Sequence, residues 1–314
     1  MTFIQQQKEI YEIKKTFQET LSEDLNLTEV FAPLFFENGT GEQDELGGQE
    51  KSVTFKSKST GKKYEVVHSL AKWKREMLSN HDFPLYTGIV TNMKAIRADE
   101  ENISDIHSML VDQWDWECVI PATSRDFKTL KSYAQSVYLS VLNCAQKYSP
   151  KNILDILPDN LHFIHSEELL DKYPEKTPKE REHLIAKKYG AVFIIGIGGK
   201  LKNNQEHDTR ASDYDDWTTL NNHGRKGLNG DLIVWCPSIN KSLELSSMGI
   251  RVDASTLIRQ LNIKNEKFKL EKPWHQKLLS GKLPQTIGGG IGQSRMIMFI
   301  KQFKNIHDFK SFKH

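Results

Sequence analysis

Apolar residues recur at helical spacing in two stretches of the first half of the chain. Residues 4–21 carry apolar residues among Lys, Glu and Gln, and Ser124 is placed to cap a second helix. The first stripe comprises Ile4, Ile10, Phe17 and Leu21, and the second Phe127, Leu130, Ala134, Val137, Tyr138, Val141 and Ala145. Each stripe predicts a helix with one face packed against a core.

Two more helices are predicted in the second half. Thr177 and Glu180 have the spacing of a capping box. Pro178 suits the first helical position, and Gly190 suits the end of that helix. A closing helix would place Met296, Phe299, Ile300 and Phe303 on one face. It follows the glycine-rich sequence TIGGGIG, which is expected to form a turn.

Strand-like segments outnumber the helices between them. They are predicted at 27–35, 52–57, 63–68, 89–96, 108–118, 191–199, 230–236 and 242–252. Pro33 cannot donate a hydrogen bond to a ladder, so the first strand is expected at an edge or an interface. Several strands follow one another directly, which favours an α+β fold in which an antiparallel β-sheet is flanked by helices. No repeat or linker divides the chain, and residues 1–314 are expected to form a single domain.

Composition excludes several classes of function. The 43 Lys and Arg residues nearly balance the 41 Asp and Glu residues, so no nucleic-acid partner is expected. The cysteines Cys118, Cys144 and Cys236 lie in apolar runs, which favours reduced, buried thiols. The first residues lack an apolar signal core, and no stretch approaches the ~20 apolar residues that cross a bilayer. A cytoplasmic protein without a membrane partner is expected.

The predicted strand 108–118 has an unusually polar face. Strict alternation sends Val111, Gln113, Asp115 and Glu117 to one side and two tryptophans, with other residues, to the opposite side. A half-solvated surface strand is the usual meaning of such alternation. The flanking tryptophans favour a binding site instead, because amide and carboxylate oxygens can accept hydrogen bonds from a ligand ammonium.

Carboxylates elsewhere suggest a metal site. Asp231 and Glu244 lie on separate predicted strands that could pair. Mg²⁺ commonly uses one or two carboxylates together with phosphate oxygens and water, although a surface position explains each residue equally well. The cluster of Asp213, Asp215 and Asp216 is equally compatible with a solvated acidic loop.

Two regions could hold an anion. The three consecutive glycines of TIGGGIG permit close approach to the backbone, and Arg295 follows them. The segment VVHSLAKWKREM carries His68, Ser69, Lys72, Lys74 and Arg75, although solvated helix charges explain it as well. Neither a GxxxxGK[ST] loop nor an early GxGxxG fingerprint occurs, so a nucleotide would be held in another way.

Seven segments together resemble the aspartate-ammonia ligases of the asparagine synthetase A type. They are VVHSLAKWKR, MKAIR, VDQWDWE, DYDDW, LNGDLIVW, ELSSMGIRVD and QTIGGGIGQSR, and they match in order, spacing and residue choice over essentially the whole chain. That family is in turn similar to the catalytic domain of class II aminoacyl-tRNA synthetases. The segments that contain Pro33, Arg97 and Arg295 resemble the three synthetase motifs.

The resemblance implies a single catalytic domain, a homodimer joined through motif one, and ATP bent across the face of the sheet. Gln113 and Asp115 fall on the pair that grips the amino-acid ammonium in aspartyl synthetases. The residues implied to bind aspartate are Ser69, Lys74, Gln113, Asp115, Asp215, Ser246 and Ser247. Those implied to bind ATP are Arg97, Arg295, Asp231, Glu244, Arg251 and Gly290.

The resemblance also implies the reaction. L-Aspartate, ATP and ammonia would give L-asparagine, AMP and pyrophosphate through a β-aspartyl-adenylate. Mg²⁺ is expected on Asp231 and Glu244, and Arg97 and Arg295 are expected to stabilise the reacting phosphates. Asp44 matches a residue near substrate and is the expected base that takes a proton from ammonium.

Three other functions share parts of this pattern. A class II aminoacyl-tRNA synthetase is expected to need an anticodon-binding domain of ~100 residues before motif one. A noncatalytic paralogue is expected to lose the phosphate-binding arginines and the metal-binding acids, which are present here. A glutamine-dependent synthetase needs an amino-terminal cysteine, where this chain has Thr2, so free ammonia is the expected nitrogen donor.

Overall fold

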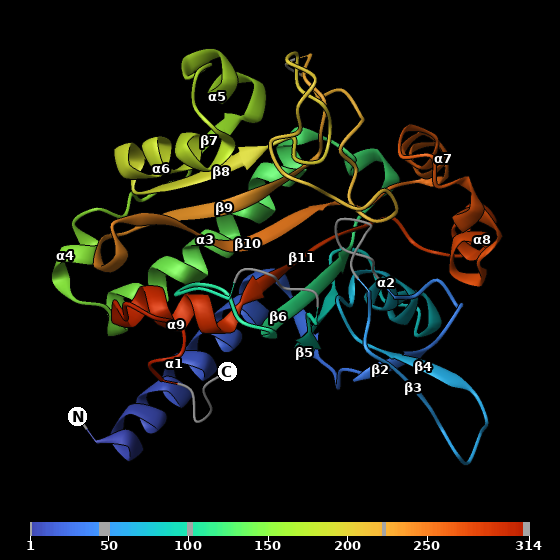
Figure 1. The fold of residues 1–314 in the computed structure, drawn as a ribbon, viewed down its shortest axis with the longest axis horizontal. Coiled ribbons are helices and arrows are strands. Elements are labelled where there is room, and N and C mark those ends of the chain that lie inside the picture. The colour runs from blue at the N-terminus through green and yellow to red at the C-terminus, as the bar shows by residue number, and fades with distance from the viewer. Residues whose placement is uncertain (1, 44–50, 99–102, 222–223, 310–314) are drawn as a thin grey trace.

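The computed structural model describes residues 2–43, 51–98, 103–221 and 224–309. These residues are built around an eight-stranded sheet with strand order β1-β5-β6-β11-β10-β9-β8-β7 (Figure 1). In that order the strands are β1 (Leu27–Glu29), β5 (Gly88–Ile96), β6 (Leu110–Val119), β11 (Thr286–Gly292), β10 (Lys241–Ile250), β9 (Asn229–Cys236), β8 (Ala191–Ile195) and β7 (His162–His165).

The sheet is mostly antiparallel but mixed. Strands β5 to β8 pair antiparallel in the order above, whereas β1 pairs parallel with β5 and β7 pairs parallel with β8. The α+β prediction of a large sheet flanked by helices is therefore confirmed, but a purely antiparallel sheet is wrong at both edges. Each parallel pair is joined by a crossover that contains other elements, as parallel pairing requires.

One face of the sheet is covered by α1 (Phe3–Leu25), α3 (Phe127–Tyr148) and α9 (Gln293–Lys301). In Figure 1, α3 passes behind β9 and β10. The main core lies here, and the rings of Phe17 and Trp114 meet in it with centroids 4.4 Å apart. The predicted stripe of α1 is confirmed except at Ile4, which is exposed in the first turn of the helix.

The opposite face is covered at its two ends. Helix α2 (Ala71–Asn80) packs on β5, β6 and β11, and α5 (Ser166–Lys172) and α6 (Pro178–Tyr189) pack on β7 to β10. A polar stripe from the middle strands therefore lies between α2 and α6. This position defines the candidate site.

The remaining elements lie at the periphery. A small sheet has the order β2-β4-β3, and further short helices connect the larger elements. They are β2 (Phe35–Glu37), β3 (Thr54–Lys56), β4 (Lys63–Val66), η1 (Ala122–Ser124), α4 (Lys151–Leu154), η2 (Pro237–Ile239), α7 (Ala254–Ile263), η3 (Lys267–Glu271) and α8 (Pro273–Leu279). The strand predicted over 27–35 is shorter than expected, because β1 ends at Glu29 and Pro33 lies in the connection to β2.

The predicted helix ends are right in one case and wrong in another. The side chain of Thr177 and the N3 residue Glu180 form the predicted capping box of α6, and Gly190 ends that helix with a φ of 76°. Helix α3 is capped by Asp126, whose Oδ1 accepts a hydrogen bond from Thr129 N at 2.7 Å. The predicted cap, Ser124, instead belongs to the short helix η1.

The glycine-rich sequence forms strand β11, so the predicted turn is wrong. This strand lies between β6 and β10, and α9 begins directly after it. A Cβ atom at Gly288 would lie 2.0 Å from Glu117 Oε2, and one at Gly289 would lie 2.5 Å from Met248 Cβ. Glycine is needed here because side chains from neighbouring strands occupy both faces of β11.

The three cysteines are free and buried, as predicted. Among the residues that the structure describes, no helix has the length and apolar character needed to cross a membrane.

Candidate active site

The polar stripe begins on β6. Gln113, Asp115 and Glu117 alternate along this strand with Trp114 and Trp116, which are buried in the main core. The predicted alternation is therefore confirmed. Asp115 and Glu117 are themselves buried, so this face is not a solvated surface.

Glycines form the next part of this face. Gly288, Gly290 and Gly292 on β11 pair with Glu117, Asp115 and Gln113 in register. A Cβ atom at Gly290 would lie 2.5 Å from Gln113 Oε1. The absence of side chains at these three positions leaves the backbone of β11 as the floor between the polar residues of β6 and those of β10.

Buried ion pairs join α2 to this floor. Lys74 Nζ bonds the Asp115 carboxylate, donates to Trp116 O at 2.8 Å and lies 3.7 Å from Glu117 Oε2. Burial alone would raise the pKa of Glu117, but the cations of Arg251 and Lys74 hold it below its usual value. The carboxylate of Glu117 is therefore ionised although it is fully buried.

The ion pairs continue away from β6. Arg251 binds Glu117 with Nη2 to Oε2 at 2.7 Å, and its Nη1 bonds Asp215. Arg210 Nη2 donates to Asp231 Oδ1 at 2.5 Å, and its Nε lies 3.5 Å from Asp215 Oδ2. Burial raises the pKa of Asp215 although both arginines oppose the shift.

Two members of this network were given no role by the sequence interpretation. Alternation placed Glu117 on the same face as Gln113 and Asp115, as the structure confirms, but only the latter two were assigned to the site. Arg210 stands in the segment HDTRASDYDDW, where no spacing or periodicity marks it.

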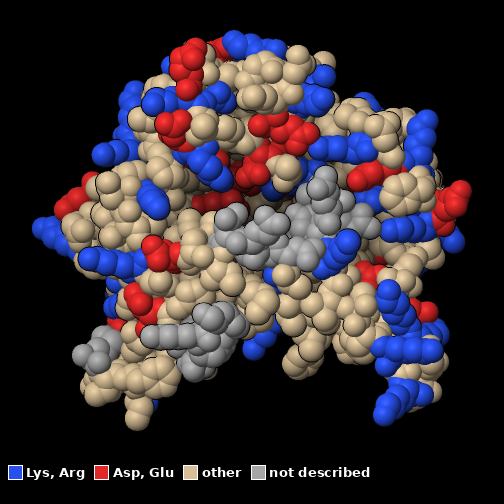
Figure 2. All heavy atoms as spheres, viewed as in Figure 1, with Lys and Arg blue, Asp and Glu red and all other residues tan. Residues whose placement is uncertain are grey.

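Asp231 and Glu244 lie on neighbouring strands, as predicted. Burial, together with the carboxylates of Glu244 and Asp208, raises the pKa of Asp231 to about 7 against the effect of Arg210. Burial would also raise the pKa of Glu244, but Arg295, Lys179 and other cations lower it. Figure 2 shows Asp and Glu atoms gathered near the middle of this face.

This pair of acids fits a hard divalent cation. The buried carboxylate of Asp231 and the half-buried carboxylate of Glu244 repel each other and provide oxygen donors, and Mg²⁺ commonly takes one or two such groups with phosphate oxygens and water. Within the described ranges no group of three or more His, Cys, Asp or Glu residues could hold a metal ion. The two carboxylates would therefore need oxygens from a bound substrate or from water to complete the coordination.

A cavity of about 90 Å³ opens beside Glu244. It is lined in part by residues that the sequence interpretation assigned to ATP or aspartate, namely Arg97, Gln113, Glu244, Ser247, Gly290 and Arg295. Arg97 directly follows β5, and Arg295 lies in the first turn of α9. Arg295 Nη1 lies 3.3 Å from Glu244 O and 3.9 Å from its Oε1.

Three further predicted site residues lie at the start of α2, on β10 and outside the described part of the chain. Ser69 Oγ accepts a hydrogen bond from Ala71 N at 3.2 Å, at the start of α2. Ser246 lies at an irregularity of β10, and its buried Oγ has no hydrogen-bond partner among the described residues. Asp44 lies outside the described residues.

The alternative of solvated charges is wrong for α2 and for the acidic cluster. Lys72, Lys74 and Arg75 are each at most 3% exposed. Asp213 and Asp216 are buried as well, and Arg125 Nη2 donates to Asp216 Oδ2 at 2.5 Å. These charges have partners inside the protein.

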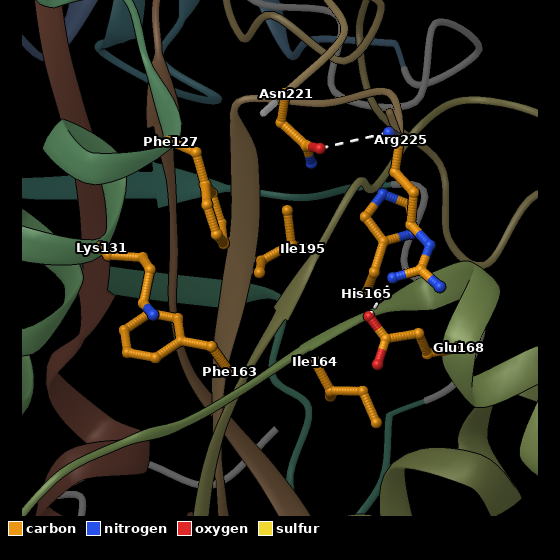
Figure 3. Close-up of a pocket in the computed structure, with 9 residues that line it drawn as sticks. All are labelled: Phe127, Lys131, Phe163, Ile164, His165, Glu168, Ile195, Asn221 and Arg225. Carbon is orange, nitrogen blue, oxygen red and sulfur yellow. Dashed lines mark hydrogen bonds and ion pairs between the residues drawn. The ribbon is translucent and has the colours of Figure 1, made fainter. Parts of the chain in front are cut away.

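A separate cavity of about 180 Å³ lies between α3, β7 and α5 (Figure 3). Lys131 Nζ lies 4.7 Å from the centroid of the Phe163 ring, and Arg225 forms an ion pair with Glu168. His165 Nε2 donates to Lys226 O at 2.9 Å, and its Nδ1 accepts from Glu167 N at 3.0 Å. Arg225, Glu168 and His165 thus bond to protein groups, and none of the predicted site residues lines this cavity.

The family that is described as aspartate-ammonia ligase matches residues 4–311. This chain belongs to the aspartate-ammonia ligase family. It is therefore a ligase of asparagine biosynthesis.

Solved structures show the same fold. The chain is similar to asparaginyl-tRNA synthetase from Pyrococcus horikoshii complexed with asparaginyl-adenylate, with a TM-score of 0.70 and 14% identity over 97% of this chain and 68% of that chain. It is similar to the Entamoeba histolytica asparaginyl-tRNA synthetase in complex with asparaginyl-adenylate, with a TM-score of 0.67 and 12% identity over 96% and 66% of the two chains. The aspartyl-tRNA synthetase from Entamoeba histolytica matches with a TM-score of 0.66 and 12% identity over 97% of this chain and 58% of that chain.

This chain thus spans about two thirds or less of the length of these synthetases. At this level of identity the likeness shows the fold, which is that of the catalytic domains of class II aminoacyl-tRNA synthetases.

Proposed function

We propose that this chain amidates the β-carboxylate of L-aspartate with free ammonia, using ATP and forming a β-aspartyl-adenylate. The observation that carries the proposal is the continuous polar stripe between α2 and α6. Acceptor groups for an ammonium lie at one end of it, and arginines with two hard carboxylates lie at the other. The family match and the adenylate in two similar synthetases agree with this reaction.

The end of the stripe near α2 suits the amino acid. The Gln113 amide oxygen and the Asp115 carboxylate can accept hydrogen bonds from the substrate ammonium. Lys74 fixes the position of Asp115, and Arg251 fixes Asp215. Pairing of this kind holds acceptor groups in place before the substrate binds, which lowers the cost of ordering them.

The end near β10 suits the nucleotide. In the first step an oxygen of the β-carboxylate attacks the α-phosphorus of ATP, the bond from that phosphorus to the bridging oxygen breaks, and pyrophosphate leaves with the electron pair. Arg97 would neutralise the carboxylate and the α-phosphate, and Arg295 would hold the terminal phosphates. Magnesium, held by Asp231 and Glu244, would supply further positive charge beside the phosphate oxygens.

Ammonia completes the reaction. Its nitrogen attacks the acyl carbon, the bond from that carbon to the AMP oxygen breaks, and AMP leaves. Near neutral pH ammonia is largely protonated to ammonium, which cannot attack the acyl carbon. A carboxylate should therefore take the proton from ammonium, and we assign this role to Asp44. Asp44→Asn should therefore slow asparagine formation while pyrophosphate exchange continues, and a variant that retains both at full rate would refute the role.

We also propose that the enzyme is a cytoplasmic homodimer joined through the segment that follows β1. Phe31 is 99% exposed and Leu34 is 57% exposed, on either side of Pro33. An exposed apolar segment of this kind is typical of a protein interface.

The proposed reaction is tested by incubating the purified protein with ATP, magnesium and aspartate, together with ammonium, with glutamine or with neither. Asparagine, AMP and pyrophosphate should appear together with ammonium, and asparagine should be absent with glutamine. Pyrophosphate exchange without asparagine formation would instead indicate activation of an amino acid for another acceptor. No nucleotide turnover at all would favour the noncatalytic paralogue.

A further inference from the structure

A larger cavity adjoins the candidate site. It has a volume of about 570 Å³ and lies beside β10, α6 and the start of α9. Glu244 and Arg295 line both this cavity and the smaller one that contains Arg97 and Gln113. The two cavities therefore meet where the terminal phosphates of the nucleotide are proposed to lie.

The larger cavity is lined by several lysines. Lys179 comes from α6, Lys241 begins β10, and Lys304 follows α9. The neutral or charged imidazole of His183, also on α6, lines the same cavity. Figure 2 shows several Lys and Arg groups on the left of this face, the side on which Figure 1 places α6 and α9. Together with Arg295 these residues can surround a small polyanion.

The acids at the rim are already bound to protein groups. Glu182 lies 3.0 Å from Lys179 Nζ and 3.2 Å from His207 Nε2. Asp105 Oδ1 accepts a hydrogen bond from Asn305 Nδ2 at 3.0 Å. Glu244 is the remaining acid of the lining, and we have assigned it to the metal.

Two of the cations have no such partner. Within the described part of the chain, neither Lys241 nor Lys304 forms an ion pair, and both are exposed at the cavity. His183 is positioned by a hydrogen bond between its Nδ1 and Ser242 Oγ at 2.7 Å. The lining thus offers positive groups that the protein itself does not neutralise.

We propose that this cavity binds pyrophosphate as it leaves the reaction, with Lys241 and Lys304 as its recognition residues. The proposal rests on the ATP-dependent reaction proposed above, in which the bond to the α-phosphorus breaks and pyrophosphate carries away the electron pair and the negative charge. Arg295, which lines both cavities, lies where the anion would pass from one to the other. Gln113 lines the smaller cavity but not the larger one, so pyrophosphate in the larger cavity can depart while the aspartyl-adenylate stays bound.

The test compares the wild-type enzyme with the double variant Lys241→Ala/Lys304→Ala. Both side chains are exposed, so their removal leaves the core intact. Lys131→Ala is the matched control, because Lys131 lines the separate cavity of Figure 3. The probes are pyrophosphate and inorganic phosphate in direct calorimetric titrations, and pyrophosphate in the exchange reaction.

The expected result is a loss of pyrophosphate affinity of roughly tenfold or more in the double variant, since hydrogen bonds to charged groups are involved. The KM for pyrophosphate in exchange should rise by the same factor, while the KM for aspartate stays unchanged. Lys131→Ala should behave as wild type. Wild-type binding of inorganic phosphate as tight as that of pyrophosphate would contradict a site for the diphosphate.

Failure of this inference differs from failure of the proposed function. Equal pyrophosphate affinity in the wild type and the double variant would overturn the inference, even if the wild type makes asparagine from ammonium. The other outcome is a wild type that makes no asparagine but binds pyrophosphate, together with a double variant that does not bind it. That result would refute the ligase proposal and support the pyrophosphate site.

Discussion

At the scale of single residues, the site depends on charges that have no contact with water. Glu117 is fully buried and accepts hydrogen bonds from Arg251, at 2.7 Å from its Nη2, and from Thr286 Oγ1 at 2.7 Å. Removing one partner of a buried ion pair costs far more than the pair contributes, because the remaining charge is left without compensation. The space over Gly288 is therefore essential, since the carboxylate of Glu117 occupies it.

Gly288→Ala should destabilise the protein by about 2–4 kcal/mol, because the new Cβ atom would lie 2.0 Å from Glu117 Oε2 and would displace it from Arg251. The free energy of unfolding, measured by denaturant titration, tests this. Gly292→Ala is the control, because its Cβ atom would meet Arg295 at an ordinary distance of 3.6 Å. Equal stability of the two variants would show that Glu117 is not held as described.

The polar face of β6 could be predicted from the sequence because side chains alternate between the two faces of a strand with a period of two residues. Alternation alone assigns Gln113, Asp115 and Glu117 to a common face. The buried charges of α2 could not be predicted in this way, since their partners are far away in the chain. Lys74 pairs with a residue 41 positions away and Lys72 with one 141 positions away. Without those partners, solvated helix charges remain the simplest interpretation of the segment.

At the scale of elements, the glycine sequence shows where local preference gives the wrong answer. Glycine is depleted in strands, so the sequence TIGGGIG suggests a turn. In the structure it nevertheless forms β11 between β6 and β10. The side chains of Glu117 and Met248 fill the space on its two faces. Tertiary packing therefore selects the strand, and a single sequence carries no sign of that packing.

Asp213 joins its loop to two helices. Its Oδ2 lies 2.8 Å from Lys72 Nζ on α2 and 2.9 Å from His275 Nε2 on α8. Burial alone would raise the pKa of Asp213, but Lys72 and His275 hold it well below its usual value. A carboxyl whose pKa is lower in the folded state contributes stability above its unfolded pKa, and that stability is lost as the pH falls through the folded pKa.

Asp213→Asn should therefore lower the free energy of unfolding by about 3–5 kcal/mol at pH 7, where it leaves the buried Lys72 uncompensated. The difference between wild type and variant should shrink as the pH falls below about 4, the pKa of an unfolded aspartate. Denaturant titrations at pH 7, 5 and 3.5 test this prediction. Glu37→Gln, at an exposed ion pair with Lys62, should change stability by less than about 1 kcal/mol at each pH. A pH-independent difference for Asp213→Asn would contradict the assignment.

At the scale of the whole molecule, the main core lies on one face of the sheet and the candidate active site lies on the other. Helices α1, α3 and α9 pack on the first face, while α2, α5 and α6 cover the ends of the second. The main strands and helices were largely predictable because their periodic patterns are long. The parallel edge pairs were not, because strand order depends on crossovers that no local pattern specifies.

The proposed homodimer gives a prediction at this scale. Phe31→Asp should convert the dimer to a monomer, because it places a charge in the apolar segment at the proposed interface. Light scattering coupled to size-exclusion chromatography measures the mass. Phe268→Asp, at a residue on η3 that is also exposed, should leave the mass unchanged. A wild type that is monomeric, or a dimer that survives Phe31→Asp, would refute the proposed interface.

The central claim is that ATP activates the β-carboxylate of aspartate by forming an acyl-adenylate. The most direct measurement uses aspartate labelled with ¹⁸O in both β-carboxylate oxygens, turned over with ATP, magnesium and ammonium, and follows the label by mass spectrometry. The account predicts one labelled oxygen in AMP and one in the side-chain amide of asparagine, because the carboxylate oxygen that attacks the α-phosphorus stays with AMP. AMP without label, or label in free phosphate with formation of ADP, would contradict an adenylate intermediate.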